Sequence, residues 1–366
     1  MQPTGDPNTP FPSAPELVDS AILLATLPNL SVPHFLAPVV TWATAHTRNR
    51  LIIVLFSRHF NVHYSHNGPL KNDHLTFSEI QSLSRTESWD AVQRILTFTY
   101  VQATKVAQDA NKVLMEVDVL LKGLNEDLDP QLAKDVDICF RVTGDSIAVP
   151  LPECITLLRQ LYIRPGDRHS ESRITTLPGT PTPSDDPLPT LYPVTALGGT
   201  FDHLHAGHKI LLSMGAYITS RKLIVGITDD ELLKNKANRH ILQKLPVRTE
   251  KVRQFLNFFK PEIVPEIVPI TDVYGPTGWD PDIQALVVSK ETLSGADAIA
   301  KHRQEHKLPP LRTFLIDVIS ATNASLDHED AGWLKENKLS STFIRQWIVD
   351  NNKQEEEEGE EESLAR

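Results

Sequence analysis

Cysteine is scarce in this chain: its 366 residues include only two, Cys139 and Cys154. Two cysteines supply neither a disulfide framework nor the spacing of a zinc site, so we expect both to be reduced thiols of a cytoplasmic protein. The N-terminus lacks a basic segment followed by an apolar run, which argues against a secretory signal peptide. An apolar stretch at 21–30 is interrupted by Pro28 and is too short to cross a bilayer, so no membrane span is expected.

Positive charge is not in excess either. The formal net charge is −11, with 36 Lys and Arg residues against 47 Asp and Glu residues. Proteins that bind nucleic acid generally carry a basic surface, so nucleic acid is not an expected partner. Part of the negative charge lies in a glutamate-rich run at 354–362, and we expect residues 351–366 to form a disordered, solvated tail.

The order of apolar runs predicts two folded regions. Residues 1–163 alternate strand-like and helix-like patterns, which predicts a smaller α/β N-terminal domain whose role no motif reveals. Its expected elements are a strand at 50–57, a helix at 89–106, and strands at 113–121 and 136–142. Residues 164–190 are rich in proline, threonine and aspartate, which predicts an extended linker between the two regions.

Three histidines of the first region, His59, His63 and His66, have roughly helical spacing. That spacing could suit a metal site, but Asn61, Gly68 and Pro69 favour a loop. We therefore interpret them as surface histidines and expect no protein metal site here.

Residues 191–350 alternate strands and helices in the manner of a doubly wound parallel sheet, a Rossmann-like fold. The expected strands lie at 192–197, 222–227, 285–288 and 313–319. The expected helices lie at 209–214, 246–259, 294–306 and 342–349, with Ser340 as the N-cap of the last one.

The most informative segment is GGTFDHLHAGH at 198–208, between the first strand and the first helix of this region. A glycine-rich turn at the start of a helix presents backbone N–H groups and the positive end of the helix to a phosphate. His205 and His208 are three residues apart, so their rings can lie on the same face and contact one bound anion.

This segment resembles the signature of the HxGH nucleotidyltransferase superfamily, which joins a nucleotide monophosphate to a phosphorylated small molecule. A second segment, KLSSTFIR at 338–345, resembles the ISSTxIR motif that closes the ATP site in the same superfamily. The two motifs are about 130 residues apart, which suits one Rossmann-like domain. DVYGP at 272–276 and LVVSKET at 286–292 resemble the eukaryotic, fungal-type phosphopantetheine adenylyltransferases. The resemblance covers residues 192–350.

The resemblance implies an enzyme that transfers AMP from ATP to 4′-phosphopantetheine, giving dephospho-coenzyme A and pyrophosphate in coenzyme A biosynthesis. It implies that His205 and His208 contact the α- and β-phosphates, with His208 the main stabiliser of the transition state. The other residues that it implies for substrate binding are Gly198, Gly199, Thr200, Phe201, Gly207, Ser340, Ser341, Thr342 and Arg345.

The superfamily also implies a lysine after the second strand that bridges both phosphates. Lys234 and Lys236 are the candidates, and we favour Lys236. A basic residue within 301–303 is a candidate for the work that arginines do in bacterial relatives. Mg²⁺ is expected as a cofactor with ATP, held by phosphate oxygens and water rather than by protein ligands.

Two alternatives stay open. One is another cytidylyl- or adenylyltransferase of the superfamily, acting on glycerol phosphate, phosphoethanolamine or nicotinamide mononucleotide. The other is a nucleotide-binding regulator or scaffold without catalysis. No GxxxxGK[ST] phosphate loop occurs in the sequence, so we expect one activity and no attached kinase. Other enzymes of coenzyme A synthesis are candidate partners, and no sequence feature indicates an oligomeric state.

Overall fold

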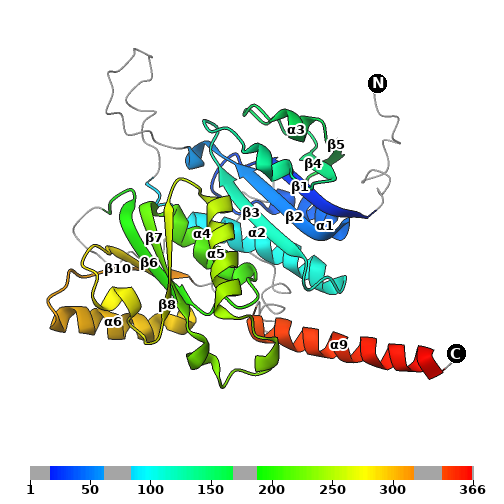
Figure 1. Ribbon diagram of the computed structural model, residues 1–366. Helices are drawn as coiled ribbons and strands as arrows, with labels where there is room; N and C mark the ends of the chain where they lie inside the picture. Colours follow the sequence, from blue (N-terminus) through cyan, green and yellow to red (C-terminus); the bar gives the residue numbers. More distant parts are fainter. Residues whose placement is uncertain (1–16, 62–83, 168–187, 317–339, 365–366) are drawn as a thin grey trace, which may run out of the picture. The chain divides into compact units, whose positions relative to one another are not determined.

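The computed structural model describes residues 17–61, 84–167, 188–316 and 340–364. The chain separates into two compact units, Met1–Leu188 (unit 1) and Pro189–Arg366 (unit 2), shown in Figure 1. Most of the predicted linker, and the residues His63 and His66, lie outside the described residues.

Unit 1 is an α/β domain built on a five-stranded sheet in the order β3-β2-β1-β4-β5, with every neighbouring pair parallel. Its main elements are β1 (Val18–Thr26), α1 (Ala37–Ala45), β2 (Thr47–Phe56), α2 (Trp89–Asp109), β3 (Glu116–Lys122), β4 (Ile138–Val142), α3 (Glu153–Thr156) and β5 (Arg159–Ile163). The sequence analysis missed β1, the central strand. Its continuous apolar run is typical of a parallel strand that is covered on both faces.

Unit 2 has a five-stranded parallel sheet in the order β10-β9-β6-β7-β8. Its main elements are β6 (Tyr192–Gly199), α4 (Ala206–Tyr217), β7 (Thr219–Thr228), α5 (Leu245–Phe259), β8 (Val264–Ile270), β9 (Ala285–Ser289), α6 (Leu293–Glu305), β10 (Arg312–Ile316) and α9 (Ser341–Leu364). The predicted Rossmann-like doubly wound sheet is confirmed. The sequence analysis missed β8, which contains Pro265 and Pro269; β8 is an edge strand, where proline's missing N–H is tolerated.

Helices pack on both faces of the second sheet. Ala296 and Ile299 of α6 join a buried cluster with Val194 and Ala196 of β6. On the other face, α4 approaches the sheet so closely that a Cβ on Gly215 would lie 2.5 Å from Leu197. The sheet is therefore a rigid, covered platform, and its strand ends position the loops described below.

The last described helix, α9, is longer than predicted. It runs from Ser341 to Leu364 and includes the glutamate-rich run that the sequence analysis expected to be disordered. Glutamate has a high helix propensity, so a run of glutamates can continue a helix that packing has already started. Among the helices of the described ranges, none has the length and apolar character needed to cross a membrane.

Candidate active site

The first motif lies at the carboxyl end of the central strand of unit 2. After β6 the chain enters the loop 200–205, and α4 begins at Ala206 with His205 as its N-cap. The strand order reverses between β6 and β9, so this loop stands at the switch point where open α/β sheets bind ligands. The predicted strand–loop–helix context of the motif is confirmed.

The loop brings the two histidines together. The rings of His205 and His208 stack with their centroids 3.8 Å apart. Burial lowers the pKa of His205 to about 3, and the nearby charges of His203 and Lys209 act in the same direction. Burial and the neighbouring His205 also lower the pKa of His208. Both imidazoles are therefore neutral near pH 7.

The Nδ1 atoms of His205 and His208 are buried and have no hydrogen-bond partner among the described residues. Buried polar atoms are normally hydrogen-bonded, so two adjacent exceptions are a feature that needs an explanation. A bound anion that accepts hydrogen bonds from the imidazoles would supply the missing partners. The structure thus brings together the two histidines that the sequence assigned to phosphate binding.

The loop backbone adopts a conformation that is unfavourable for L-residues. Phe201 has a φ of 51° and His203 a φ of 43°, both in the left-handed region. Such strain persists only where surrounding contacts enforce it, and it is concentrated at functional sites. The Phe201 ring is fully buried, and a Cβ on Gly199 would lie 3.1 Å from it. Gly199 therefore leaves room for the ring that anchors the strained loop.

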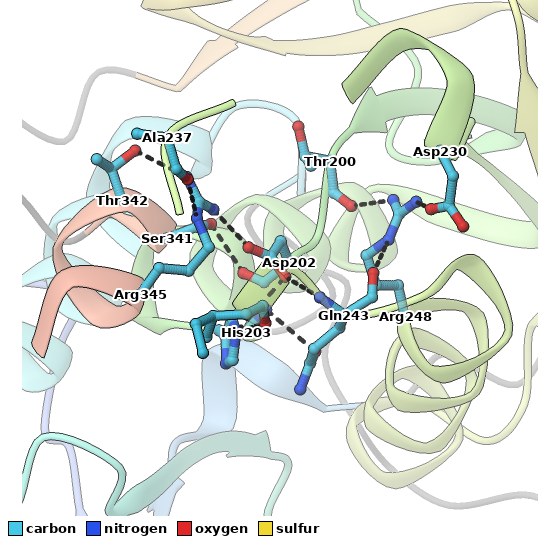
Figure 2. Close-up of polar contacts among 11 residues, drawn as sticks. Thr200, Asp202, His203, Asp230, Ala237, Gln243, Arg248, Ser341, Thr342 and Arg345 are labelled. Atoms are coloured by element: carbon cyan, nitrogen blue, oxygen red, sulfur yellow. Dashed lines mark hydrogen bonds and ion pairs between the residues drawn. The ribbon is translucent and has the colours of Figure 1, made fainter. Parts of the chain in front are cut away.

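Asp202 lies between these two strained residues and is the centre of the polar network in Figure 2. Its buried carboxylate accepts a hydrogen bond from Arg345 Nη1 over 2.5 Å and one from the backbone N–H of Gln243 over 2.9 Å. The sequence analysis gave Asp202 no role. The signal was present, because an acidic side chain inside a phosphate-binding motif needs a cationic partner.

The second motif reaches the first through Arg345 and Ser341 (Figure 2). Arg345 also donates to the carbonyl of Ala237 and to the hydroxyl of Thr342, and its side chain is buried. The Ser341 hydroxyl donates to the backbone carbonyl of Asp202 over 2.8 Å. The sequence analysis assigned these side chains to phosphate binding, whereas in the structure their polar atoms join the two motifs.

Ser340 caps α9 as predicted. Its hydroxyl accepts a hydrogen bond from the backbone N–H of Phe343 over 3.3 Å. This bond satisfies one of the backbone donors at the helix start. The two candidate lysines differ: Lys234 pairs with Glu231, whereas the exposed Lys236 forms no ion pair with any described residue.

Arg248 of α5 is a site residue that sequence reasoning missed. Its guanidinium is completely buried and donates to the backbone carbonyls of Thr200 and Thr228 and to the Asp230 carboxylate (Figure 2). It thereby joins the end of β6 to the end of β7. No local motif marks Arg248, because its function depends on contacts that the fold brings together.

Within the candidate basic segment 301–303, Arg303 is not exposed to a ligand. Arg303 is 1% exposed and donates to the carbonyls of Pro309, Thr277 and Asp280. These contacts make it a support for the loops around β9 rather than an exposed phosphate-binding arginine. Within the described ranges, no group of three His, Cys, Asp or Glu side chains has the arrangement of a metal site.

Comparison with known proteins places the site in a family. A family model described as cytidylyltransferase-like matches residues 196–347. Over 155 residues the chain is 48% identical to the phosphopantetheine adenylyltransferase of Saccharomyces cerevisiae, a match that covers 42% of this chain and 48% of the yeast protein. An uncharacterized protein of Schizosaccharomyces pombe is 42% identical over 156 residues, which cover 43% of this chain and 48% of that protein. The aligned part of this chain thus spans about half the length of these two relatives.

A shorter relative is matched over most of its length. The phosphopantetheine adenylyltransferase of Pyrobaculum aerophilum is 34% identical over 149 residues, which cover 41% of this chain and 87% of the archaeal protein. Residues 196–347, which the family model matches, include both motifs that Asp202 and Arg345 connect. The chain therefore belongs to the phosphopantetheine adenylyltransferase family of cytidylyltransferase-like proteins.

Proposed function

We propose that unit 2 transfers AMP from ATP to 4′-phosphopantetheine, releasing pyrophosphate and forming dephospho-coenzyme A. The observation that carries this proposal is the junction of the two motifs, where Asp202 bonds Arg345 and Ser341 beside the stacked pair His205 and His208. The names of the relatives in yeast and Pyrobaculum support the choice of acceptor. The same names weigh against the alternative acceptors and against a purely regulatory protein.

In the proposed reaction an oxygen of the 4′-phosphate attacks the α-phosphorus of ATP. The bond from that phosphorus to the bridging oxygen breaks, and pyrophosphate leaves with the electron pair. Such a transfer is accelerated mainly by positioning and by stabilising the developing charge. The residues of this chain can supply both functions, because the loop conformation is fixed by Asp202 and Arg248 before substrate binds.

The histidines act in this scheme as hydrogen-bond donors to phosphate oxygens. They are neutral without ligand, and a bound polyanion favours their charged form, so substrate binding should raise their pKa. His208 is the proposed stabiliser of the transition state. The exposed Lys236 is the proposed phosphate bridge, since its ammonium is not engaged by any described acidic residue, while Lys234 pairs with Glu231.

Mg²⁺ is proposed to enter as part of the MgATP substrate. In the loop, Asp202 accepts bonds from Arg345 and Gln243, so its carboxylate is already used within the protein. When bound to ATP, the ion would neutralise phosphate charge. A cytoplasmic location is also part of the proposal, supported by two cysteines that form no disulfide.

The decisive test is pyrophosphate release by the full chain with matched substrate pairs. ATP with 4′-phosphopantetheine is expected to turn over, while CTP with phosphoethanolamine or glycerol phosphate is expected to turn over much more slowly. Faster turnover of either CTP pair would contradict the substrate assignment. No turnover of any pair, with ATP still bound, would favour the non-catalytic alternative.

A further inference from the structure

The two units share more than a fold class. In each, the first strand is central, the second and third strands extend to one side, and the fourth and fifth extend to the other. Many unrelated Rossmann-type domains share this order, so the order alone does not establish a repeat. Local irregularities and side-chain contacts are more discriminating, because they are not required by the topology.

The central strands carry the same irregularity at the same place. In β1 the register against β2 shifts between Val18 and Ser20. In β6 the register against β7 shifts between Tyr192 and Val194. In both units the first of these residues donates its backbone N–H to the residue that precedes the second strand, His46 in unit 1 and Ile218 in unit 2.

A lysine clamp is also repeated. One lysine, located just before the third strand of each unit, donates from Nζ to backbone carbonyls at the junction of the first helix and the second strand. The donor Lys112 bonds Thr44, Ala45 and Thr47, and the donor Lys260 bonds Ala216 and Thr219. At the same junction a threonine hydroxyl bonds the carbonyl four residues earlier, Thr47 to Ala43 and Thr219 to Gly215.

In both units the residue just before the fourth strand makes the same two hydrogen bonds with the central strand. Asp137 donates its backbone N–H to the carbonyl of Ser20, and its side chain accepts the N–H of Ser20. In unit 2 Gln284 makes the same two bonds with Val194. A reciprocal pair of this kind is not dictated by a parallel sheet. Its presence in both units aligns β1 with β6 and β4 with β9, residue by residue.

We propose that unit 1 is a second copy of the nucleotidyltransferase fold within this chain, and that its phosphate position is filled by the carboxylate of Asp145. The alignment of β1 with β6 puts Thr26 at the position of Thr200, at the carboxyl end of the central strand. The chemistry assigned to that position rests on the function proposed for unit 2, whereas the repeat itself does not.

In unit 1 the glycines that would lie against a phosphate are replaced, and the backbone amides that would bind it are already hydrogen-bonded. Leu24 and Ala25 stand where unit 2 has Gly198 and Gly199. The backbone N–H of Thr26 donates to Asp145 Oδ2 over 2.7 Å, and the next N–H, of Leu27, donates to the carbonyl of Phe56. Both amides are therefore engaged before any ligand arrives.

The acid itself is a feature of unit 1. Asp145 is three residues beyond the end of β4, and the aligned residue beyond β9 is the neutral Thr292. A fixed carboxylate at this point would repel a phosphate, and it also engages the backbone N–H of Thr26 that would otherwise donate to the phosphate. The Thr26 hydroxyl is buried without a partner among the described residues. Unit 1 is thus a silent copy, meaning a copy of the fold that does not bind phosphate, and transferase chemistry belongs to unit 2.

The test uses the full chain labelled with ¹⁵N-threonine. NMR spectra record the backbone amide chemical shifts of Thr26 and Thr200 while inorganic phosphate is added. In the wild-type protein the Thr200 signal is expected to shift and the Thr26 signal to stay. Asp145→Ala is expected to let the Thr26 signal shift. Asp145→Asn, whose side-chain carbonyl can still accept the Thr26 N–H, is expected to keep it unmoved. AMP transfer should be unchanged in both variants.

A Thr26 shift in the wild-type protein, or no shift in a folded Asp145→Ala variant, would overturn the inference. If Asp145→Ala does not fold, the stoichiometry of MgATP binding to the wild-type chain decides. One site per chain is expected, and two would contradict a silent copy. Failure of Thr200 to respond would count against the function proposed for unit 2, independently of the result at Thr26.

Discussion

The carboxylate of Asp202 lies 2.5 Å from Nη1 of Arg345, which is 143 residues further along the chain. The pair is buried on both sides and connects the loop after β6 to the first turns of α9. A buried ion pair adds little to the free energy of unfolding compared with an apolar pair of the same size. Loss of one partner, however, leaves the other charge buried without compensation. The connection therefore makes the two motifs interdependent.

Asp202→Ala is expected to lower the free energy of unfolding by about 3–5 kcal/mol, because the Arg345 charge stays buried without its partner. Arg345→Ala should lower the free energy of unfolding by a similar amount, and the double variant should lower it by less than the sum of the two single changes. Urea denaturation of the three variants measures the coupling. Glu250→Ala is a matched control, since it removes an exposed pair with Arg253 and should change stability by less than about 0.5 kcal/mol. Additive effects of Asp202 and Arg345 would refute the interdependence.

His208→Ala is expected to lower kcat by about 10²–10⁴ while the fold is retained, because it removes a donor directed at charge that develops in the transition state. Steady-state pyrophosphate release and circular dichroism measure the two effects. His306→Ala, an exposed histidine on the same unit, is the control and should leave kcat unchanged. A His208→Ala enzyme with normal kcat would eliminate the proposed mechanism.

The lowered pKa values of His205 and His208 predict that acid destabilises the protein. The unfolded chain binds protons below the ordinary pKa of 6.5, whereas folded His205 stays neutral down to about pH 3, so stability falls as the pH drops through this window. His205→Gln should reduce that slope by up to about 1.4 kcal/mol per pH unit between about pH 6 and 4. Urea unfolding at several pH values, with His306→Gln as the control, measures the slope. An unchanged slope would show that His205 titrates normally.

Arg248→Met is expected to destabilise unit 2 and to impair acceptor binding. The variant leaves the carbonyls of Thr200 and Thr228 without their donor, at a cost of about 1–3 kcal/mol for each carbonyl that water cannot reach. KM for 4′-phosphopantetheine should rise, because Thr200 is one of the residues that the family resemblance implies for substrate binding. Arg253→Met on the exposed side of α5 is the control. An effect on stability without any change in KM would show that Arg248 supports the fold and not the loop.

A fragment of residues 187–366 is expected to fold and to retain AMP transfer, since the complete second sheet and both motifs lie within it. Circular dichroism and kcat relative to the full chain test this. A folded fragment without turnover would show that unit 1 is needed to complete the active site.

The features of the fold that depend on the local pattern of apolar and turn residues were predicted correctly from the sequence. The strand–loop–helix around 198–208 and the parallel sheet of unit 2 follow from apolar periodicity and turn residues. It missed β1 because a continuous apolar run does not by itself distinguish a buried strand from other buried segments. It missed β8 because prolines usually argue against a strand, except at a sheet edge.

The candidate site was predicted only partly, for a physical reason. The first motif is local, so the closeness of His205 and His208 could be predicted from their spacing. The partners that hold the loop are distant in sequence, and Arg248 and the pairing of Asp202 with Arg345 depend on the folded chain. The role of Arg345 therefore could not be inferred from its motif alone.

The strained turn at Phe201 and His203 has a consequence for how the protein is made. The contacts that Asp202 receives from α9 come from Ser341 and Arg345, which lie 139 and 143 residues further along the chain and so leave the ribosome after the loop does. A nascent chain can therefore form the central sheet of unit 2 while the loop after β6 still lacks these supports. If the function proposed for unit 2 is correct, a chain that stops before residue 345 would lack the Arg345 contact to the loop and is expected to bind ATP poorly.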